Sequence, residues 1–408
     1  MDEQSLIWFK TVQINYSTFK CCSRIAIKCR PMFRKLIFTA FVTSPLILWS
    51  QDKPLDMKMD FEEYDPPSSL VVEEHRLSKA KFPFIDIHNH QGSMDSGDLS
   101  KLIADMDKLN MAVMNNLSGR GFSSNGPGDF SGNDEHLKKS LDNISKNFPT
   151  RFTLFTTINF LDIDDPSWGA NTARQLETNV KLGAKGLKIY KSLGLSVKDK
   201  NGKRVQIDDP RIDPVWAKCG ELGIPVLIHS ADPKQFWQPI DKNNERWLEL
   251  KTHPGRRYEG RDVTWETLIA EQHNVFKKHP KTKFIDAHLG WFGSDLKKLG
   301  QLLDQMPNVY TEIGAVIAEL GRQPRTAKAF LTKYQDRVLF GKDSWVPEEY
   351  QTYFRVLETE DEYFPYHKRY HAFWRMYGIG LPDEILKKIY YKNALSLLPG
   401  MDKSQFPK

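Results

Sequence analysis

The sequence is poor in cysteine, with only four in 408 residues, and three of these fall within the first 29 positions. A chain that loses its beginning keeps Cys219 as its one thiol, which excludes an internal disulfide. The fold must then be held by its core. With 40% apolar and 12% aromatic residues, the chain can bury a large one.

The body of the chain also lacks an excess of positive charge. The formal net charge is +6, but residues 1–51 carry seven Lys or Arg and two acidic residues, which leaves +1 for the remainder. A nearly neutral body is not typical of proteins that bind nucleic acid through charge. We therefore expect no nucleic-acid partner.

The apolar run at residues 36–49 is too short to cross a bilayer comfortably. It follows a short basic stretch, and this order is typical of a secretory signal peptide. We predict that translation starts at Met32, that residues 1–31 are not translated, and that residues 32–51 are removed. The mature protein is then periplasmic or secreted, without stable membrane association. The alternative is an uncleaved leader that anchors the protein in the membrane.

From residue 82 onward, short apolar runs alternate with amphipathic helical stretches. Eight such repeats, about one every 30–40 residues, indicate an α/β fold of the (β/α)8 TIM barrel type. The alternative, a doubly wound sheet, usually has a glycine-rich phosphate-binding turn after its first strand, and none follows Ile87. The expected strands are 84–88, 112–117, 152–158, 186–190, 224–229, 283–288, 309–313 and 337–341. The expected helices are 98–109, 133–147, 171–182, 214–222, 264–279, 294–305 and 325–334.

Two long segments follow the second and fifth strands, at residues 118–133 and 231–262. Segments that follow strands lie on the catalytic face of a barrel, so these insertions are candidate substrate walls. Their Trp and Arg side chains either cover an aromatic or carboxylate-bearing ligand or pack the insertion itself. Residues 348–377 are expected to form a helical cap. The predicted segments are a leader 1–51, an extended arm 52–81, the barrel 82–400 and a tail 401–408.

Two histidines, His88 and His90, end the first expected strand. Side chains alternate along a strand, so Phe84, Asp86, His88 and His90 are expected on one face. Two imidazoles placed in this way can reach one metal ion, although a lone pair of this kind is weak evidence. The other strands must supply the missing ligands.

The same alternation gives ligand-type side chains at the ends of four more strands. His229 closes the fifth strand and Asp343 follows the eighth. In the sixth, His288 is expected on the inner face with Phe284 and Asp286, while Ile285 and Ala287 face the helices. The fourth strand places Lys188 and Tyr190 on one face, and an interior lysine is costly unless its charge is matched or removed. Together these residues predict a metal site. We interpret six further histidines as surface or packing residues: His136, His253, His273, His279, His367 and His371.

With these motifs in order, residues 82–400 resemble the amidohydrolase superfamily, in particular the branch that contains the aminocarboxymuconate-semialdehyde decarboxylase-like enzymes. The motifs that carry the resemblance are His88-Asn89-His90, Ile228-His229, Ile285-Asp286-Ala287-His288-Leu289-Gly290-Trp291, the run 336–343 and Tyr391-Lys392-Asn393-Ala394.

The resemblance implies a divalent ion, commonly zinc, or two such ions. It implies that His288 is a ligand of a second ion or a catalytic group that polarises the substrate. Lys188 matches a lysine that some members carbamylate to bridge two metals, whereas other members use one metal. The ligands implied for the first ion are His88, His90, His229 and Asp343.

The leading functional hypothesis is hydrolysis of an amide, lactone or ester bond in a small molecule. The metal lowers the pKa of a bound water, and Asp343 takes the proton and passes it to the leaving group. The alternative is a metal-dependent non-oxidative decarboxylase acting on a carboxylic acid. Tyr190, Arg256 and Arg257 are predicted to bind substrate, the two arginines as carboxylate clamps. A non-catalytic binding protein is disfavoured because no ligand is missing. A homodimer is left open.

Overall fold

The computed structural model describes residues 56–117 and 126–407. The chain divides into two units, Met1–Pro66 and Pro67–Lys408. The predicted leader, with Cys21, Cys22 and Cys29, lies outside the described residues, as does part of the first insertion. In the first unit, residues 56–66 are extended apart from a turn at 61–63. All the helices and strands described below belong to the second unit.

Eight parallel strands form one sheet in which each strand pairs with its neighbours in the sequence. The strands are β1 Phe84–Asn89, β2 Met111–Leu117, β3 Phe152–Thr156, β4 Gly186–Ile189, β5 Val226–Ile228, β6 Phe284–Asp286, β7 Val309–Glu312 and β8 Val338–Leu339. Each of the eight lies within or overlaps the range expected from the sequence.

Backbone hydrogen bonds join the last strand to the first. The N–H of Ile87 donates to the carbonyl of Phe340 at 3.0 Å, and the N–H of Asp343 donates to the carbonyl of His88 at 2.7 Å. These bonds bring the sheet round into a nearly closed cylinder. The predicted (β/α)8 barrel is therefore confirmed.

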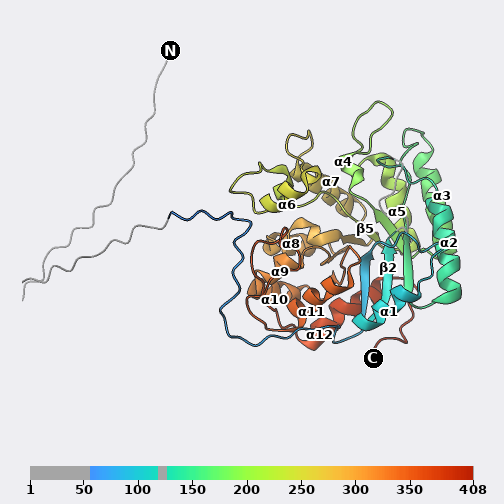
Figure 1. The fold of residues 1–408 in the computed structure, drawn as a ribbon. Coiled ribbons are helices and arrows are strands. Elements are labelled where there is room, and N and C mark those ends of the chain that lie inside the picture. Colours follow the sequence, from blue (N-terminus) through green and yellow to red (C-terminus); the bar gives the residue numbers. More distant parts are fainter. Residues whose placement is uncertain (1–55, 118–125, 408) are drawn as a thin grey trace, which may run out of the picture. The chain divides into compact units, whose positions relative to one another are not determined.

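Helices follow the strands and surround the barrel, and α2, α3 and α5 lie side by side along its outside (Figure 1). Caps fix where some of them begin: the side chain of Thr264 accepts the N–H of Thr267 at the start of α7, and Asp295 does the same for Lys298 at α8. The barrel helices are α1 Ser100–Leu109, α2 Asn133–Asn147, α3 Trp168–Leu182, α5 Asp213–Leu222, α7 Trp265–Lys278, α8 Leu296–Gln305 and α10 Pro324–Lys333.

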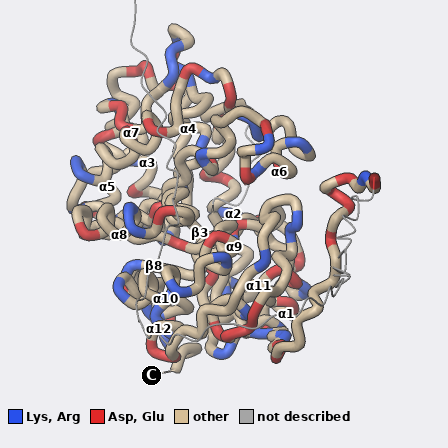
Figure 2. The backbone as a smooth tube through the Cα atoms, turned by 90° about the vertical axis from the view of Figure 1, so that its left-hand side faces the viewer, with Lys and Arg blue, Asp and Glu red and all other residues tan. Residues whose placement is uncertain are grey.

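Shorter helices lie in the loops and in the C-terminal region. They are α4 Ser192–Leu195, α6 Trp247–Thr252, α9 Ile317–Gly321, α11 Tyr350–Glu358, α12 Asp383–Lys387 and α13 Asn393–Leu397. Basic and acidic residues are interspersed along the helices and loops (Figure 2). Within residues 56–117 and 126–407, no helix combines the length and apolar character needed to cross a membrane.

The expected facing is wrong for Phe84 and Asp86 in β1 and for Phe284 and Asp286 in β6. Phe84 and Asp86 contact helix α11, where Tyr350 donates a 2.6 Å hydrogen bond to Asp86. The pairing of β1 with β2 shifts register twice, and such irregularities break the alternation of side chains. In β6, Phe284 packs against Phe276 of α7, and Asp286 accepts a 2.7 Å bond from Gln272 on the same helix.

His288 reaches the interior by a different route from the one that alternation predicts. Strand β6 ends at Asp286, and His288, Leu289 and Trp291 all adopt left-handed backbone conformations with φ between 55° and 60°. This turn re-aims the chain, so that His288 points inward although Asp286 points outward. His288 faces the interior as expected, but this turn places it there and not the alternation of side chains along the strand.

Candidate active site

Six polar side chains meet at the carboxyl ends of the strands. Five strands contribute them, at positions up to 255 residues apart in the sequence, and all but Asp343 are largely or fully buried. The six are His88, His90, Lys188, His229, His288 and Asp343.

Asp343 lies between the two histidines of the first motif. Its Oδ1 atom is 3.2 Å from Nε2 of His88 and 3.6 Å from Nε2 of His90. The three donor atoms all lie within 4.8 Å of one another. Ligand atoms that share one zinc ion lie roughly 3.3 Å apart, because each bond is about 2.0–2.2 Å long. The structure thus brings three of the four predicted ligands to a spacing that suits one ion.

His229 and His288 form the other side of the site. The ring centroids are 4.5 Å apart, and the ring of His288 is 4.9 Å from that of His88. Trp291 packs against His288, with the ring centroids 4.6 Å apart. In the described part of the chain, Nε2 of His229 and of His288 is buried and makes no hydrogen bond, although Oδ1 of Asp232 lies 3.7 Å from Nε2 of His229. A buried polar atom without a partner is costly unless a ligand satisfies it.

The protonation of these rings suits metal binding. Burial lowers the pKa of His229 to about 3 and that of His90 well below its usual value, so both rings are neutral near pH 7. Nδ1 of His288 is 2.7 Å from the carbonyl of Gly314. A carbonyl only accepts, so this nitrogen carries the proton and Nε2 has a free lone pair. Neutral imidazole nitrogens with a carboxylate are a donor set that divalent metals bind.

Lys188 is fully buried beside these groups. Its Nζ atom is 3.5 Å from Nε2 of His88 and 5.3 Å from the centre of the Tyr190 ring. Burial lowers the pKa of Lys188 to about 8, against the opposing charges of Asp343 and Glu312. About one tenth of the amine is therefore neutral at pH 7, the form in which it can react with carbon dioxide. Carbamylation of Lys188 stays a prediction.

Glu312 is a site residue that the sequence reasoning missed. This carboxylate ends β7, is fully buried, and accepts hydrogen bonds from Nδ1 of His88 at 3.0 Å and from the N–H of His288 at 2.7 Å. Burial raises the pKa of Glu312, but His88 and His288 outweigh that effect and lower it to about 2. The available signal was an acidic residue at the carboxyl end of an apolar run, the same signal that was used for Asp343.

Glu312 also forms a compact group with His88 and His288, whose donor atoms lie within 4.8 Å of one another. In this group the nitrogens near the carboxylate are already hydrogen-bonded, Nδ1 of His88 to Glu312 and Nδ1 of His288 to Gly314. Glu312 therefore holds the two histidines by hydrogen bonds on the side that faces away from the proposed metal. The Nε2 atoms on the opposite side of each ring remain available for a metal.

The predicted substrate-binding residues have different surroundings. Tyr190 stacks on Phe130 and lies 5.9 Å from the ring of His90, measured between centroids. Arg256 donates to Glu249 at 2.6 Å, and Arg257 donates to Glu259 at 2.6 Å. Tyr190 is thus next to the site, while both arginines are paired with carboxylates of their own insertion.

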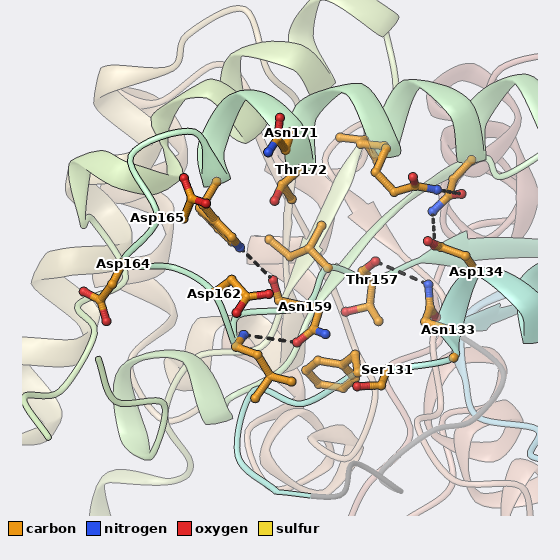
Figure 3. Close-up of a pocket in the computed structure, with 18 of the residues that line it drawn as sticks. Ser131, Asn133, Asp134, Thr157, Asn159, Asp162, Asp164, Asp165, Asn171 and Thr172 are labelled. Atoms are coloured by element: carbon orange, nitrogen blue, oxygen red, sulfur yellow. Dashed lines mark hydrogen bonds between the residues drawn. The ribbon is translucent and has the colours of Figure 1, made fainter. Parts of the chain in front are cut away.

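A cavity of about 640 Å³ lies against α3, lined also by the loop after β3 and by the start of α2 (Figure 3). Phe130 lines it and stacks on Tyr190, with the ring centroids 5.2 Å apart. Most of its other lining side chains are polar, including Asn133, Asn159 and Thr172. The cavity therefore neighbours the cluster of histidines, although none of the six site residues lines it.

Similar folds are found among solved structures. The structure resembles that of an amidohydrolase from Staphylococcus aureus, with a TM-score of 0.50, 18% identity, and coverage of 78% of this chain and 99% of that chain. Two further similar structures are 2,6-dihydroxybenzoate decarboxylase from Rhizobium, with a TM-score of 0.49, 14% identity and coverage of 78% and 98%, and 5-carboxyvanillate decarboxylase from Sphingomonas paucimobilis, with a TM-score of 0.46, 15% identity and coverage of 78% and 99%.

No curated protein matches the sequence. The model of the family described as "Amidohydrolase" matches residues 157–400, which include strands β4 to β8 and with them Lys188, His229, His288 and Asp343. Because this match extends over more than half of the chain, the protein belongs to the amidohydrolase family.

Proposed function

We propose that the protein is a metal-dependent hydrolase that cleaves an amide, lactone or ester bond in a small molecule. The observation that carries the proposal is the position of Asp343, a carboxylate within 3.2 Å and 3.6 Å of two histidine nitrogens. Its side chain is 30% exposed, whereas that of His88 is fully buried. Water and substrate can therefore reach Asp343.

The ligand set proposed for a single ion is His88, His90, His229 and Asp343, with zinc as the proposed metal because nitrogen and carboxylate donors suit it. When bound, a divalent ion polarises a carbonyl group and makes water more acidic. If a second ion is present, His288 and a carbamylated Lys188 are its proposed ligands.

The reaction needs a group that moves the proton, and Asp343 is placed for this role. Its carboxylate accepts the proton of the attacking water and passes it to the leaving nitrogen or oxygen. His288 has a narrower set of roles. With its proton on Nδ1, Nε2 of the neutral ring can act as a ligand or accept a proton, and polarising a carbonyl requires the protonated ring.

Replacement of Asp343 by Asn tests the proton-transfer role. We expect Asp343→Asn to keep metal bound through the histidines and to reduce kcat by about 10²–10⁴-fold, since the amide cannot accept a proton. Metal content and turnover over a panel of amides, lactones and esters are the measurements. Asp304→Asn, an exposed carboxylate paired with Lys333, is the control. Near wild-type turnover by Asp343→Asn would rule out the role.

The decarboxylase alternative uses the same ligands, with the metal anchoring a hydroxyl or carboxylate of the substrate. Arg256 and Arg257, the predicted carboxylate clamps, are each paired with a glutamate. The two reactions differ in their products. Carbon dioxide release from a panel of carboxylic acids indicates a decarboxylase, whereas an acid together with an amine or alcohol indicates a hydrolase.

We also propose that the protein is exported through a signal peptide at residues 32–51, acts on a small molecule in the periplasm or outside the cell, and binds no nucleic acid. A homodimer is a further proposal. N-terminal sequencing of the mature protein after cell fractionation tests the export, and light scattering tests the assembly. A mature chain that retains residues 32–51 would favour the membrane-anchored alternative.

A further inference from the structure

One carboxylate behind the site contacts two of the histidines together. Oε1 of Glu312 accepts from Nδ1 of His88 and from the N–H of His288, and Oε2 accepts from the N–H of Gly314. Both oxygens are thus engaged, and the side chain has no exposed surface. Glu312 itself does not reach Asp343 or His90 through any hydrogen bond of the described residues.

The first consequence concerns the tautomer of His88. An ionised carboxylate only accepts hydrogen bonds, so Glu312 keeps a proton on Nδ1 of His88. A metal would bind at Nε2, in place of the proton that this nitrogen shares with Asp343 when no ion is bound. That Nε2 atom faces Asp343 and Lys188, at 3.2 Å and 3.5 Å. Without the carboxylate, the ring can rotate or keep its proton on Nε2, and in either case it offers no lone pair to a metal.

The second consequence concerns the backbone at His288. The left-handed conformation at this residue costs of order 1–3 kcal/mol for a residue other than glycine, and the surrounding structure must hold it. Glu312 does so by accepting the N–H of His288. It also accepts the N–H of Gly314, whose carbonyl accepts from Nδ1 of His288. Glu312 therefore fixes both the main chain and the ring of His288.

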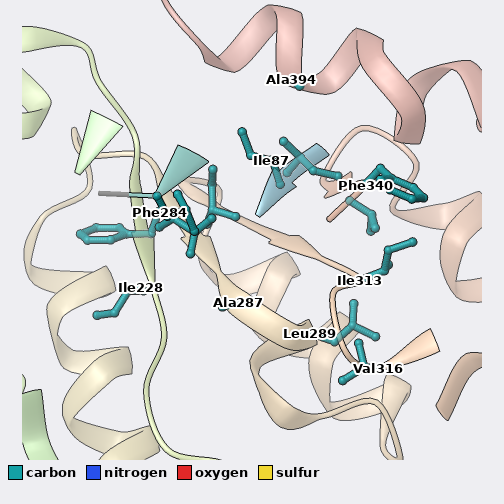
Figure 4. Packing of buried hydrophobic residues seen from close by; sticks show 14 of the residues in the cluster. Ile87, Ile228, Phe284, Ala287, Leu289, Ile313, Val316, Phe340 and Ala394 are labelled. Carbon is teal, nitrogen blue, oxygen red and sulfur yellow. The ribbon is translucent and has the colours of Figure 1, made fainter. Parts of the chain in front are cut away.

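The apolar surroundings make these bonds hard to replace. Ala287 and Leu289 on either side of His288, and Ile313 and Val316 after Glu312, are all at most 2% exposed and belong to one packed cluster (Figure 4). Room for the carboxylate comes from Gly314 and Gly341, because a Cβ atom at either position would meet Oε2 of Glu312. Water cannot readily take the place of a carboxylate in such a site.

We propose that Glu312 is a positioning residue that sets the orientation and tautomer of His88 and His288 together, and so determines how tightly the site binds metal. This inference rests on the proposed function, since it assumes a metal site. It assigns Glu312 no direct contact with metal or substrate.

The test is the metal affinity of full-length variants, measured with Zn²⁺ by competition against a chromophoric chelator. Outer hydrogen-bond partners of ligand histidines typically contribute 10–100-fold in affinity. We expect Glu312→Ala to weaken Zn²⁺ binding about 100-fold. Glu312→Gln keeps an acceptor oxygen and should weaken it about 10-fold. The visible spectrum of bound Co²⁺ should change in both variants, because the ligand geometry changes.

Glu271 offers a matched control. It is a buried carboxylate on α7 that accepts from the Arg204 side chain at 2.6 Å and from the N–H of Ile207 at 3.1 Å, away from the six site residues. Glu271→Gln should lower thermal stability but leave the Zn²⁺ affinity and the Co²⁺ spectrum unchanged. This comparison separates positioning of the ligands from a general loss of stability.

The possible outcomes are distinct. Wild-type affinity in a folded Glu312→Gln variant, with an unchanged Co²⁺ spectrum, overturns the positioning role and leaves the proposed function standing. Equal losses of affinity in Glu312→Gln and Glu271→Gln overturn it as well. A wild-type protein that binds neither ion overturns the proposed function and this inference with it.

Discussion

At the scale of single residues, a buried histidine nitrogen without a hydrogen bond has two different meanings in this protein. In His229 and His288 it faces other polar groups at the strand ends, where a metal can satisfy it. In His273 on α7 it lies among apolar rings, with Phe276 and Phe292 at centroid distances of 6.0 Å and 6.2 Å. His273 is therefore a packing residue, as interpreted from the sequence.

His273 should make the fold sensitive to acid. Burial, with Lys277 and Lys298 nearby, lowers the pKa of His273 to about 4 from 6.5. The unfolded chain therefore binds the proton more readily than the folded chain. The free energy of unfolding that depends on a neutral His273 is fully present above pH 6.5 and is lost as the pH falls toward 4. Between pH 7.5 and pH 5, the free energy of unfolding of wild type should fall by about 1–2 kcal/mol more than that of His273→Phe, which keeps a ring but cannot bind a proton.

Urea unfolding at the two pH values measures this difference. Parallel losses in wild type and His273→Phe would show that the ring of His273 does not carry the acid sensitivity. The comparison depends on the difference between pH values, so any constant packing effect of the substitution cancels.

At the scale of elements, the sequence predicted the eight strands and the residues at their carboxyl ends, because short apolar runs that alternate eight times with amphipathic helical stretches indicate a (β/α)8 barrel. It did not predict which way Phe84 or Asp286 would face, since a register shift in β1 and an early end of β6 override alternation. Glu312 carries the same local signal as Asp343, a carboxylate at the carboxyl end of an apolar run, but nothing in the sequence marks its contact with His88, 224 positions away.

The end of β8 fits closely between two other strands, and Gly341 makes this possible. A Cβ atom at Gly341 would lie 3.0 Å from the Cβ of His88 on β1 and would meet Oε2 of Glu312 on β7. We expect Gly341→Ala to shift these groups, to lower Zn²⁺ affinity at least 10-fold, and to cost about 1–3 kcal/mol of stability, as overpacking of a core does.

Gly255→Ala is the control for this substitution, because no atom lies within 4 Å of a Cβ built there. Chemical denaturation and the chelator competition measure both variants. If Gly341→Ala binds Zn²⁺ like Gly255→Ala, the close approach of β8 to His88 is not needed for the site.

At the scale of the whole molecule, the site connects the first and the last strand of the barrel. His88 lies on β1 and Asp343 follows β8, and Ile87 and Phe340 pair where the cylinder closes. An ion bound between His88 and Asp343 links the first strand to the last. Only the folded state brings these ligands together, so the ion binds the folded state alone. Binding that favours the folded state adds to the free energy of unfolding by mass action.

Removal of metal should therefore lower the thermal stability of the whole domain. With free Zn²⁺ at about 100 times its dissociation constant, the gain is about 3 kcal/mol. We expect a chelator to lower the Tm by a few degrees and added Zn²⁺ to restore it. The double variant His88→Asn, His90→Asn should show no such shift. Calorimetry measures the change, and an identical wild-type Tm with and without Zn²⁺ would contradict the predicted link.

Because the last strand closes the cylinder, the metal site can form only after that strand has been synthesised. The ribosome synthesises His88 and His90 long before Asp343, so a nascent chain that ends before residue 343 lacks one of the proposed ligands and the strand that closes the cylinder. Metal binding then follows the synthesis and folding of the whole barrel. In an exported chain, the ion would come from the destination compartment, whose metal supply would then select what the enzyme carries.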